Sequence, residues 1–244
     1  MRETVLIIGA TSDIGRAVAR RLARDGCALQ LAARDSEKLA GEVQDMRART
    51  AAAVNGHRCD VLDADGGVSL LDALEVLPDV AVCVVGLLGD QRAAQRDGAV
   101  AQRIMRTNYV GPALLMAALA ERFEQRGSGV LAGVSSVAGD RGRASNYVYG
   151  SAKAGFSAFL SGLRHRLAGS GVHVVTVKPG FVRTRMTDGL DLPPQLTAEP
   201  DEVARAVAAA IRRRRDVVYV RRVWRPIMLI VRALPERVFK RTRL

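Results

Sequence analysis

Short apolar runs alternate with longer amphipathic stretches along almost the whole of the 244-residue chain. The run 4–8 is typical of a strand that is buried on both faces, whereas Ile14, Val18 and Leu22 recur at the spacing of one helix face. Regular alternation of this kind predicts a doubly wound parallel sheet with helices on both faces. The predicted strands are 4–8, 28–33, 54–59, 80–85, 129–134, 172–177 and 217–220, and the predicted helices are 14–24, 37–49, 68–77, 99–125, 147–167 and 203–214.

The pattern predicts a single α/β domain over residues 1–222, built on a seven-stranded parallel sheet, and a basic amphipathic tail over residues 223–244. The segment 183–200 is the least regular part of the domain and contains two consecutive prolines. It follows the carboxyl end of a predicted strand, where ligands of such sheets bind. We therefore expect a lid over a substrate site, with a plain surface loop as the alternative.

The net charge of +12 comes almost wholly from arginine, with 33 Arg against 4 Lys. Such an excess indicates an anionic partner, namely a nucleic acid, a phosphorylated substrate or a membrane surface; the alternative is a solvated basic surface. Aromatic residues make up only 4% of the chain, which argues against the stacking platforms of nucleic-acid binding. The three cysteines and three histidines show no metal-ligand spacing. We expect no nucleic-acid partner, no metal, and cysteines that are small buried residues in a reducing compartment.

A glycine-containing loop, Gly9–Gly15, follows the first predicted strand and opens the first predicted helix. Backbone N–H groups in such a loop approach a pyrophosphate, and the helix dipole favours its negative charge. The loop therefore predicts a dinucleotide-binding domain of the Rossmann type, with a tight turn as the alternative. The expected phosphate-binding residues are Gly9, Thr11, Ser12, Asp13, Ile14 and Gly15.

The end of the second predicted strand indicates which nicotinamide cofactor is used. Ala33 stands where an NAD site typically has an acid for the ribose hydroxyls, and Arg34 beside it can pair with a 2′-phosphate. This favours NADPH over NADH, although Asp35 follows at once and leaves NADH open. Asp60 and Val61, after the third strand, are placed to meet the adenine, and a helix N-cap is the alternative for Asp60.

Ser136, Tyr149 and Lys153 form the candidate catalytic set. Tyr149 and Lys153 are four residues apart and share a helix face, and Ser136 lies just past a predicted strand. Reduction of a ketone needs a hydride on carbon and a proton on oxygen, which a positioned tyrosine can supply. We expect the Lys153 ammonium and the positive charge of oxidised nicotinamide to lower the pKa of Tyr149. We expect Ser136 to hold the carbonyl oxygen; a surface helix pair is the alternative for Tyr149 and Lys153.

Together these residues resemble the short-chain dehydrogenase/reductases over nearly the whole chain. The resemblance rests on the Gly9–Gly15 loop, on the catalytic set with Asn108, and on Pro179–Thr184. It implies an NAD(P)-dependent oxidoreductase acting on CH–OH and C=O groups, in which Asn108 joins the site through a water-linked proton relay. By the same analogy a homodimer is expected. The resemblance also extends the cofactor site to Gly86, Tyr149, Lys153, Pro179, Gly180, Val182 and Thr184.

Two positions depart from the family pattern: Asp13 replaces a glycine of the phosphate loop, and residues 83–86 read Cys-Val-Val-Gly in place of Asn-Asn-Ala-Gly. A narrower resemblance, over 86–90, 135–150 and 180–186, is to the branch that reduces a 2-keto-erythro-pentose on a polyprenyl phosphate to the arabinose form. It implies a polyprenyl-phosphate sugar substrate and a flavin-dependent oxidase as partner. Two alternatives stay open: a reductase of a soluble carbonyl compound such as a 3-oxoacyl thioester, and a nucleotide-sensing or nucleic-acid-binding protein on the same scaffold.

The tail carries apolar residues at helical spacing, namely Trp224, Ile227, Met228, Val231 and Leu234, surrounded by Arg221, Arg222, Arg237, Lys240, Arg241 and Arg243. A basic rim around an aromatic and aliphatic face is typical of a helix lying in a membrane interface. We therefore expect a cytoplasmic protein, peripheral at the anionic inner face of the cell membrane. The alternative is a tail that closes over the pocket or packs on a second subunit. The expected substrate mouth is flanked by Arg141, Arg143, Arg183 and Arg185, which would meet a lipid phosphate or form surface ion pairs.

Overall fold

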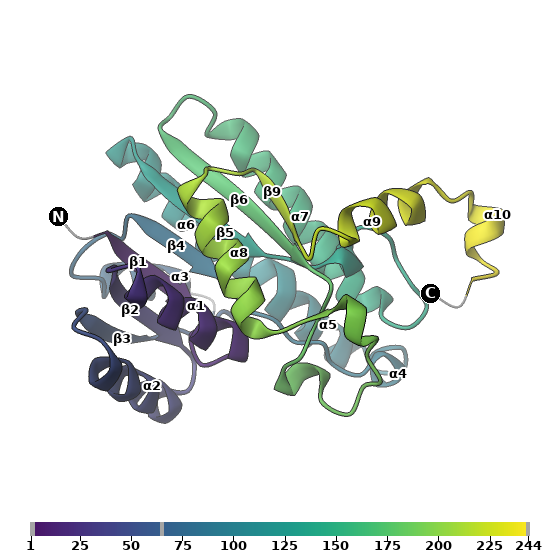
Figure 1. Ribbon diagram of the computed structural model, residues 1–244, viewed down its shortest axis with the longest axis horizontal. Coiled ribbons are helices and arrows are strands. Elements are labelled where there is room, and N and C mark those ends of the chain that lie inside the picture. The colour runs from purple at the N-terminus through teal and green to yellow at the C-terminus, as the bar shows by residue number, and fades with distance from the viewer. Residues whose placement is uncertain (1–2, 64–65, 243–244) are drawn as a thin grey trace.

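The computed structural model describes residues 3–63 and 66–242. Its centre is a seven-stranded parallel sheet in the order β3-β2-β1-β4-β5-β6-β9 (Figure 1), as the alternation predicts. The strands lie where they are predicted, with small differences at the ends of β3, β4 and β6. They are β1 Thr4–Ile8, β2 Ala28–Ala33, β3 Val54–Arg58, β4 Val80–Cys83, β5 Gly129–Val134, β6 Val172–Pro179 and β9 Val217–Val220.

Helices cover both faces of the sheet, and successive side chains of β1 enter two separate cores. Val5 and Ile7 pack on the face covered by α1, α2 and α8, whereas Leu6 and Ile8 pack on the face covered by α3, α6 and α7. This double burial is why the strand is continuously apolar. The helices are α1 Asp13–Arg24, α2 Ser36–Arg49, α3 Gly66–Asp72, α6 Gly111–Arg126, α7 Tyr147–Arg166 and α8 Pro200–Arg212.

The strand order reverses at β1, which pairs with β2 on one side and with β4 on the other. In a doubly wound sheet the crevice outside the carboxyl ends at such a reversal is the place where ligands bind. The loops that leave β1 and β4 therefore flank the expected cofactor site.

The predicted helix 99–125 is divided into three elements. Helix α5 spans Gly98–Met105, a π-helical turn spans Arg106–Val110, and α6 follows directly. The π turn carries Asn108, whose side chain is fully buried. Inserted turns of this kind occur often at functional sites, and hydrophobic periodicity does not register them because the chain stays helical on both sides.

The sequence does not predict several short elements, among them α4 Gln91–Ala94, β7 Phe181–Val182 and β8 Thr197–Ala198. Strands β7 and β8 pair with each other in a separate two-stranded sheet. The segment 183–200, expected to be a lid, is therefore anchored to the domain close to both of its ends.

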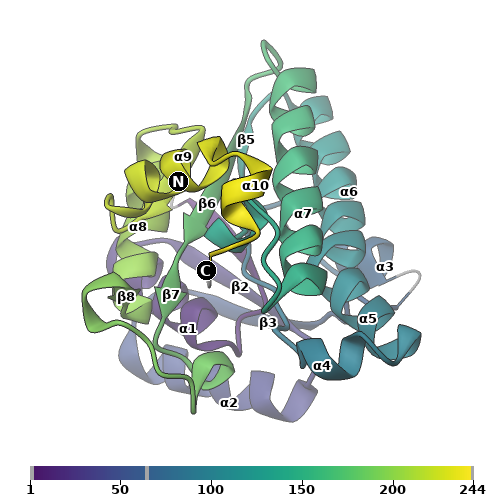
Figure 2. The same ribbon diagram turned by 90° about the vertical axis from the view of Figure 1, so that its right-hand side faces the viewer.

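The tail forms the predicted amphipathic helix, α9 (Trp224–Ala233), followed by α10 (Glu236–Phe239) (Figure 2). Its apolar face, however, is not free. Trp224, Met228 and Val231 are at most 5% exposed and pack against the domain at Val137. The expectation that these residues lie in a membrane interface is wrong, because the domain itself covers them. Arg243 lies outside the described residues.

Arg141 fastens the tail to the domain. Its Nη1 donates hydrogen bonds to the carbonyls of Val231 at 2.7 Å and Leu234 at 2.6 Å, and its guanidinium lies over the Phe239 ring at 3.9 Å. An ion pair with Glu236 at 2.9 Å completes these contacts. Arg141 is therefore engaged by the tail. Within the described ranges, no helix combines the length and apolar character needed to cross a bilayer.

Candidate active site

The loop from β1 into α1 adopts the conformation that a phosphate site needs. Ser12 is the N-cap of α1: its Oγ accepts a hydrogen bond from the Gly15 N–H at 3.0 Å and donates to the Gly9 carbonyl at 2.7 Å. Packing requires glycine at position 15, because a Cβ there would lie 2.4 Å from the Gly9 carbonyl oxygen. The N-terminus of α1 thus presents backbone N–H groups at the crevice, which fits a pyrophosphate.

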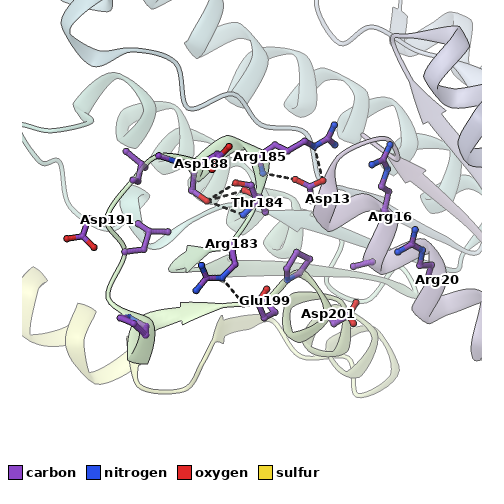
Figure 3. Close-up of a pocket in the computed structure, with 17 residues that line it drawn as sticks. Asp13, Arg16, Arg20, Arg183, Thr184, Arg185, Asp188, Asp191, Glu199 and Asp201 are labelled. Atoms are coloured by element: carbon purple, nitrogen blue, oxygen red, sulfur yellow. Dashed lines mark hydrogen bonds and ion pairs between the residues drawn. The ribbon is translucent and has the colours of Figure 1, made fainter.

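Asp13, the departure in this loop, holds the segment beyond β7 against α1. Its carboxylate accepts hydrogen bonds from the Arg185 backbone N–H at 2.8 Å and from Arg185 Nε at 2.9 Å (Figure 3). Arg185 Nη2 also donates to the Thr11 carbonyl. The two residues are 172 positions apart. No local sequence pattern connects residues at that separation, so the contact is not predicted.

The adenosine side of the crevice is a cavity of about 290 Å³ lined by Arg34, Asp35, Lys38, Asp60 and Val61 among others. Asp35 caps α2 by accepting from the Lys38 N–H, and it also forms an ion pair with the Lys38 ammonium at 3.1 Å. The Asp35 carboxylate, which leaves NADH open as a cofactor, is therefore engaged by Lys38, whereas Arg34 is exposed. Asp60 accepts from the Leu62 N–H at 3.0 Å and so caps a turn, close to the N-cap alternative.

Beside it, a second cavity of about 700 Å³ brings together the candidate catalytic set. Ser136 follows β5, and Tyr149 and Lys153 lie one turn apart near the start of α7. The expected nicotinamide-binding residues line the same cavity, namely Gly86, Pro179, Gly180, Val182 and Thr184, together with Ile14 from the phosphate loop. The structure thus places the catalytic candidates and the nicotinamide end of the expected cofactor site around one space.

Lys153 is 3% exposed, and its Nζ donates hydrogen bonds to the carbonyls of Val85 at 3.1 Å and Val134 at 3.2 Å. Burial lowers the pKa of Lys153 to about 8, because removal from water disfavours the ammonium. Ser135, which is not among the predicted site residues, donates from Oγ to the Lys153 carbonyl at 2.9 Å. This bond ties the end of β5 to the turn of α7 that carries the lysine.

Burial raises the pKa of Tyr149 to about 12, and the Ser136 hydroxyl acts in the opposite direction. The prediction that the Lys153 ammonium lowers this pKa does not hold in the protein alone. The Lys153 Nζ lies 5.9 Å from the Tyr149 ring centroid and is directed to backbone carbonyls, so the loss of hydration around the phenol dominates.

Asn108 lies behind the cavity wall and is held by backbone groups. Its Oδ1 accepts from the Leu87 N–H at 3.1 Å, while its Nδ2 donates to the carbonyls of Leu87 at 2.7 Å and Ile104 at 2.8 Å. A Cβ on Gly86 would lie 3.5 Å from Asn108 Oδ1 and 3.6 Å from Lys153 Nζ. Asn108 therefore fixes the loop after β4 directly beside the lysine.

The remaining departure, at Cys83, leaves a buried thiol at the end of β4. All three cysteines are buried, as predicted, and none of these described residues forms a disulfide. Burial raises the pKa of Cys83 and so disfavours the reactive thiolate.

Comparisons with known proteins agree with this geometry. Residues 3–194 match the sequence model of the short chain dehydrogenase family. An uncharacterized oxidoreductase of Mycobacterium tuberculosis is 42% identical over 240 residues, which cover 97% of this chain and 96% of that protein. An acetoacetyl-CoA reductase of Allochromatium vinosum is 28% identical over 222 residues, covering 85% and 90% of the two chains. A solved short-chain dehydrogenase from Sphingobium yanoikuyae in complex with NADPH superposes with a TM-score of 0.83 at 27% identity, covering 96% and 97%.

The family match begins before the phosphate loop and ends beyond the expected nicotinamide-binding residues, so it spans every element that lines the two cavities up to Leu192. The sheet order and the helices on both faces are shared with the solved relative over nearly its whole length. On this sequence and structural evidence the chain is an oxidoreductase that belongs to the short-chain dehydrogenase/reductase family.

Proposed function

We propose that this protein is an NADPH-dependent reductase of a carbonyl group. The observation that carries the proposal is the cavity that Ser136, Tyr149 and Lys153 line together beside the phosphate loop. A phenol that can donate a proton, a hydroxyl that can bond the carbonyl oxygen and a buried ammonium are the groups that this reaction requires.

The residues around the crevice fit a dinucleotide phosphate. The backbone of Gly9–Gly15 suits the pyrophosphate, Arg34 suits a 2′-phosphate, and Pro179–Thr184 suits the nicotinamide end. The solved Sphingobium relative binds NADPH, and the engagement of Asp35 by Lys38 favours the same choice here. NADH remains the second cofactor to compare. When bound, the nicotinamide ring supplies the hydride.

The raised pKa of Tyr149, about 12, keeps its phenol protonated at neutral pH, which suits a proton donor to the carbonyl oxygen. Ser136 would bond the same oxygen and hold it against the phenol. The Lys153 ammonium would stabilise the phenolate that remains after the proton has been given and would bind the nicotinamide ribose. Asn108 would maintain the lysine's surroundings and, through water, its proton supply.

The test is Tyr149→Phe, with Tyr147→Phe as the matched control because Tyr147 lies on the same helix and is 44% exposed. We expect Tyr149→Phe to lose NADPH-dependent turnover of 2,3-butanedione, a small neutral diketone, while calorimetry shows unchanged NADPH binding. Tyr147→Phe should match the wild type in both measurements. Full turnover by Tyr149→Phe would refute the proton-donor role.

For the substrate, we propose a keto-sugar on a polyprenyl phosphate, the 2-keto-erythro-pentose that is reduced to the arabinose form. The support is the resemblance of 86–90, 135–150 and 180–186 to the decaprenylphosphoryl-2-keto-erythro-pentose reductase, which implies a flavin-dependent oxidase that supplies the ketone. Turnover of a prenylphosphoryl keto-pentose in excess of that of acetoacetyl-CoA is the expected result.

A second candidate substrate is a soluble 3-oxoacyl thioester. It is favoured by the similarity to the Allochromatium vinosum acetoacetyl-CoA reductase. The same comparison of turnover separates the two substrates, because a reductase of soluble thioesters would turn over acetoacetyl-CoA faster and would gain nothing from a prenyl group.

We also propose that the protein works at the anionic inner face of the cell membrane, through the outward face of α9. Leu229 and Ile230 are 69% and 63% exposed, and Arg225 and Arg232 on the same helix are exposed beside them. Arg225→Glu with Arg232→Glu should abolish flotation with phosphatidylglycerol vesicles, whereas Arg122→Glu on α6 should not. Unchanged flotation of the double variant would overturn this assignment.

A homodimer is proposed through the helices α5 to α7, where Leu114 is 66% exposed. Leu114→Glu should then lower the sedimentation coefficient to that of a monomer, and the same value before and after the change would contradict this interface.

A further inference from the structure

Three residues that line the active-site cavity carry a buried side-chain atom with no hydrogen-bond partner among the described residues: Gln91 Nε2, Arg143 Nε and Asn146 Oδ1. They are three of the seven such side-chain atoms found in the described part of the chain. A buried polar atom without a partner is costly, so several such atoms on residues that line one cavity point to a bound water, ion or ligand as the missing partner. Two of the three atoms are donors and one is an acceptor.

The acceptor, Asn146 Oδ1, is freed by an exchange of partners at the start of α7. Asn146 is the N-cap, and an Asn there normally accepts from the N–H of the second or third helical residue. Here Gln91 Oε1 accepts from the Val148 N–H at 3.0 Å, and the Asn146 side chain makes no capping bond. The same bond sets the orientation of the Gln91 amide and leaves its Nε2 as a free donor.

Arg143 forms no ion pair with a carboxylate of the described residues, and among them its Nη2 has the Met228 sulfur, a weak acceptor, as its partner at 3.5 Å. Asp140, the carboxylate that acts on Arg143 electrostatically, is already engaged by the Lys178 ammonium and by the Tyr219 hydroxyl at 2.7 Å. Burial lowers the pKa of Arg143, with Asp140 acting in the opposite direction, yet a guanidinium stays charged in proteins. It therefore offers unbalanced positive charge at the cavity wall.

The other arginines near this mouth differ in this respect. A separate cavity of about 930 Å³ lies between α1 and the segment beyond β7, and Figure 3 shows two of its arginines bonded to carboxylates. Arg183 pairs with Glu199 at 3.0 Å and Arg185 pairs with Asp13 at 2.9 Å. The expectation that these two meet a substrate phosphate is not supported by their contacts, because each already has an anionic partner.

We propose that Gln91, Arg143 and Asn146 form a substrate subsite for an anionic, hydroxyl-bearing ketone, with Arg143 binding a phosphate group. Asn146 Oδ1 accepts a hydrogen bond from a substrate hydroxyl, and Gln91 Nε2 donates to a hydroxyl or phosphate oxygen. This inference rests on the proposed function, since it assigns the substrate class of the same cavity. A simple 3-oxoacyl chain offers no hydroxyl to Asn146, so the subsite favours the sugar phosphate.

Calorimetry on the full chain loaded with NADP⁺ tests the subsite without turnover. D-ribose 5-phosphate is the probe and D-ribose its uncharged match. We expect the phosphate to bind at least tenfold more tightly than ribose, since charge-assisted bonds to a guanidinium are about twice as strong as neutral ones. Arg143→Gln should abolish that difference, and Asn146→Ala should weaken both sugars several-fold. Arg183→Gln, the matched ion-paired arginine, should bind as the wild type does.

A further titration, with farnesylphosphoryl ribose, distinguishes a lipid-linked sugar from a free sugar phosphate as the source of the phosphate group. Tighter binding of this diester than of ribose 5-phosphate identifies a lipid-linked sugar, and weaker binding identifies a free sugar phosphate; both require Arg143. Equal binding of ribose and ribose 5-phosphate, or an Arg143→Gln variant with unchanged affinity, would overturn the proposal. As a check on folding, Arg143→Gln should melt no lower than the wild type, because it removes an unpaired buried charge.

The failure of this subsite is distinguishable from the failure of the proposed function. Tyr149→Phe should keep the ribose 5-phosphate affinity while losing turnover. A wild-type protein that binds the probe in an Arg143-dependent way but reduces neither the prenylphosphoryl keto-pentose nor 2,3-butanedione would refute the reductase and leave the subsite standing.

Discussion

Lys153→Met should make the dependence of stability on pH markedly weaker. In the folded protein the pKa of Lys153 falls from its ordinary value of 10.5 to about 8. Between the folded and the unfolded pKa the unfolded chain binds this proton and the folded protein does not, so the stability of the fold rises with pH over that range. Burial of the lysine therefore destabilises the fold at neutral pH and ceases to do so above about pH 10.5.

The size of the effect follows from about 1.4 kcal/mol for each unit of pKa difference. The two pKa values give a destabilisation of about 3 kcal/mol at pH 7 and about 1 kcal/mol at pH 10, by linkage. The free energy of unfolding of Lys153→Met minus that of the wild type should thus fall by about 2 kcal/mol between pH 7 and pH 10. The two carbonyls that lose a donor add a cost to the variant, but that cost does not depend on pH.

Urea denaturation of both proteins without cofactor, at about pH 7, 8, 9 and 10, measures this difference. Lys240→Met is the control, because Lys240 is exposed and its ammonium stays in water. The control should show no such trend. If the free energy of unfolding of Lys153→Met minus that of the wild type is the same at every pH, the claim that burial lowers the pKa of Lys153 is refuted.

Three further predictions follow from the site and the tail. Arg34→Ala should raise the KM for NADPH at least about tenfold, as expected for a lost charge-assisted pair, and leave that for NADH almost unchanged; steady-state kinetics with equal losses would contradict the 2′-phosphate contact. Trp224→Ala should lower the free energy of unfolding by about 3–5 kcal/mol, against less than about 1 kcal/mol for the exposed Leu229→Ala, and similar urea midpoints would contradict the burial of the tail. Cys83 should resist iodoacetamide until the protein unfolds, as judged by mass spectrometry, and rapid labelling of the native protein would count against its buried thiol.

The central strands could be predicted because they are buried on both faces. A run such as Val5–Ile8 has no polar position to obscure it, and the turns around it are marked by glycine. The same clarity applies to the Tyr149 and Lys153 pair, since a fixed helical spacing brings them to one face wherever the helix lies. Local pattern was sufficient for the central strands and for placing the two side chains of this pair on one helix face.

Features that depend on distant partners could not be predicted. The spacing of Trp224, Met228 and Val231 indicates a buried apolar face but says nothing of whether a bilayer or the domain covers it. The contact between Asp13 and Arg185 joins segments at opposite ends of the sequence. The Asn146 side chain makes no capping bond, since Gln91, from another helix, accepts the hydrogen bond of the Val148 N–H.

Trp224 is the single tryptophan of the chain, and three segments meet at its ring. Its ring contacts Phe181 edge-on at a centroid distance of 5.5 Å, its Nε1 donates to the Leu196 carbonyl at 3.2 Å, and its helix is the tail. The protein thereby carries an intrinsic optical probe: a shift of the indole emission on addition of a ligand would record, with no label attached, any rearrangement of the wall that the tail shares with the cavity.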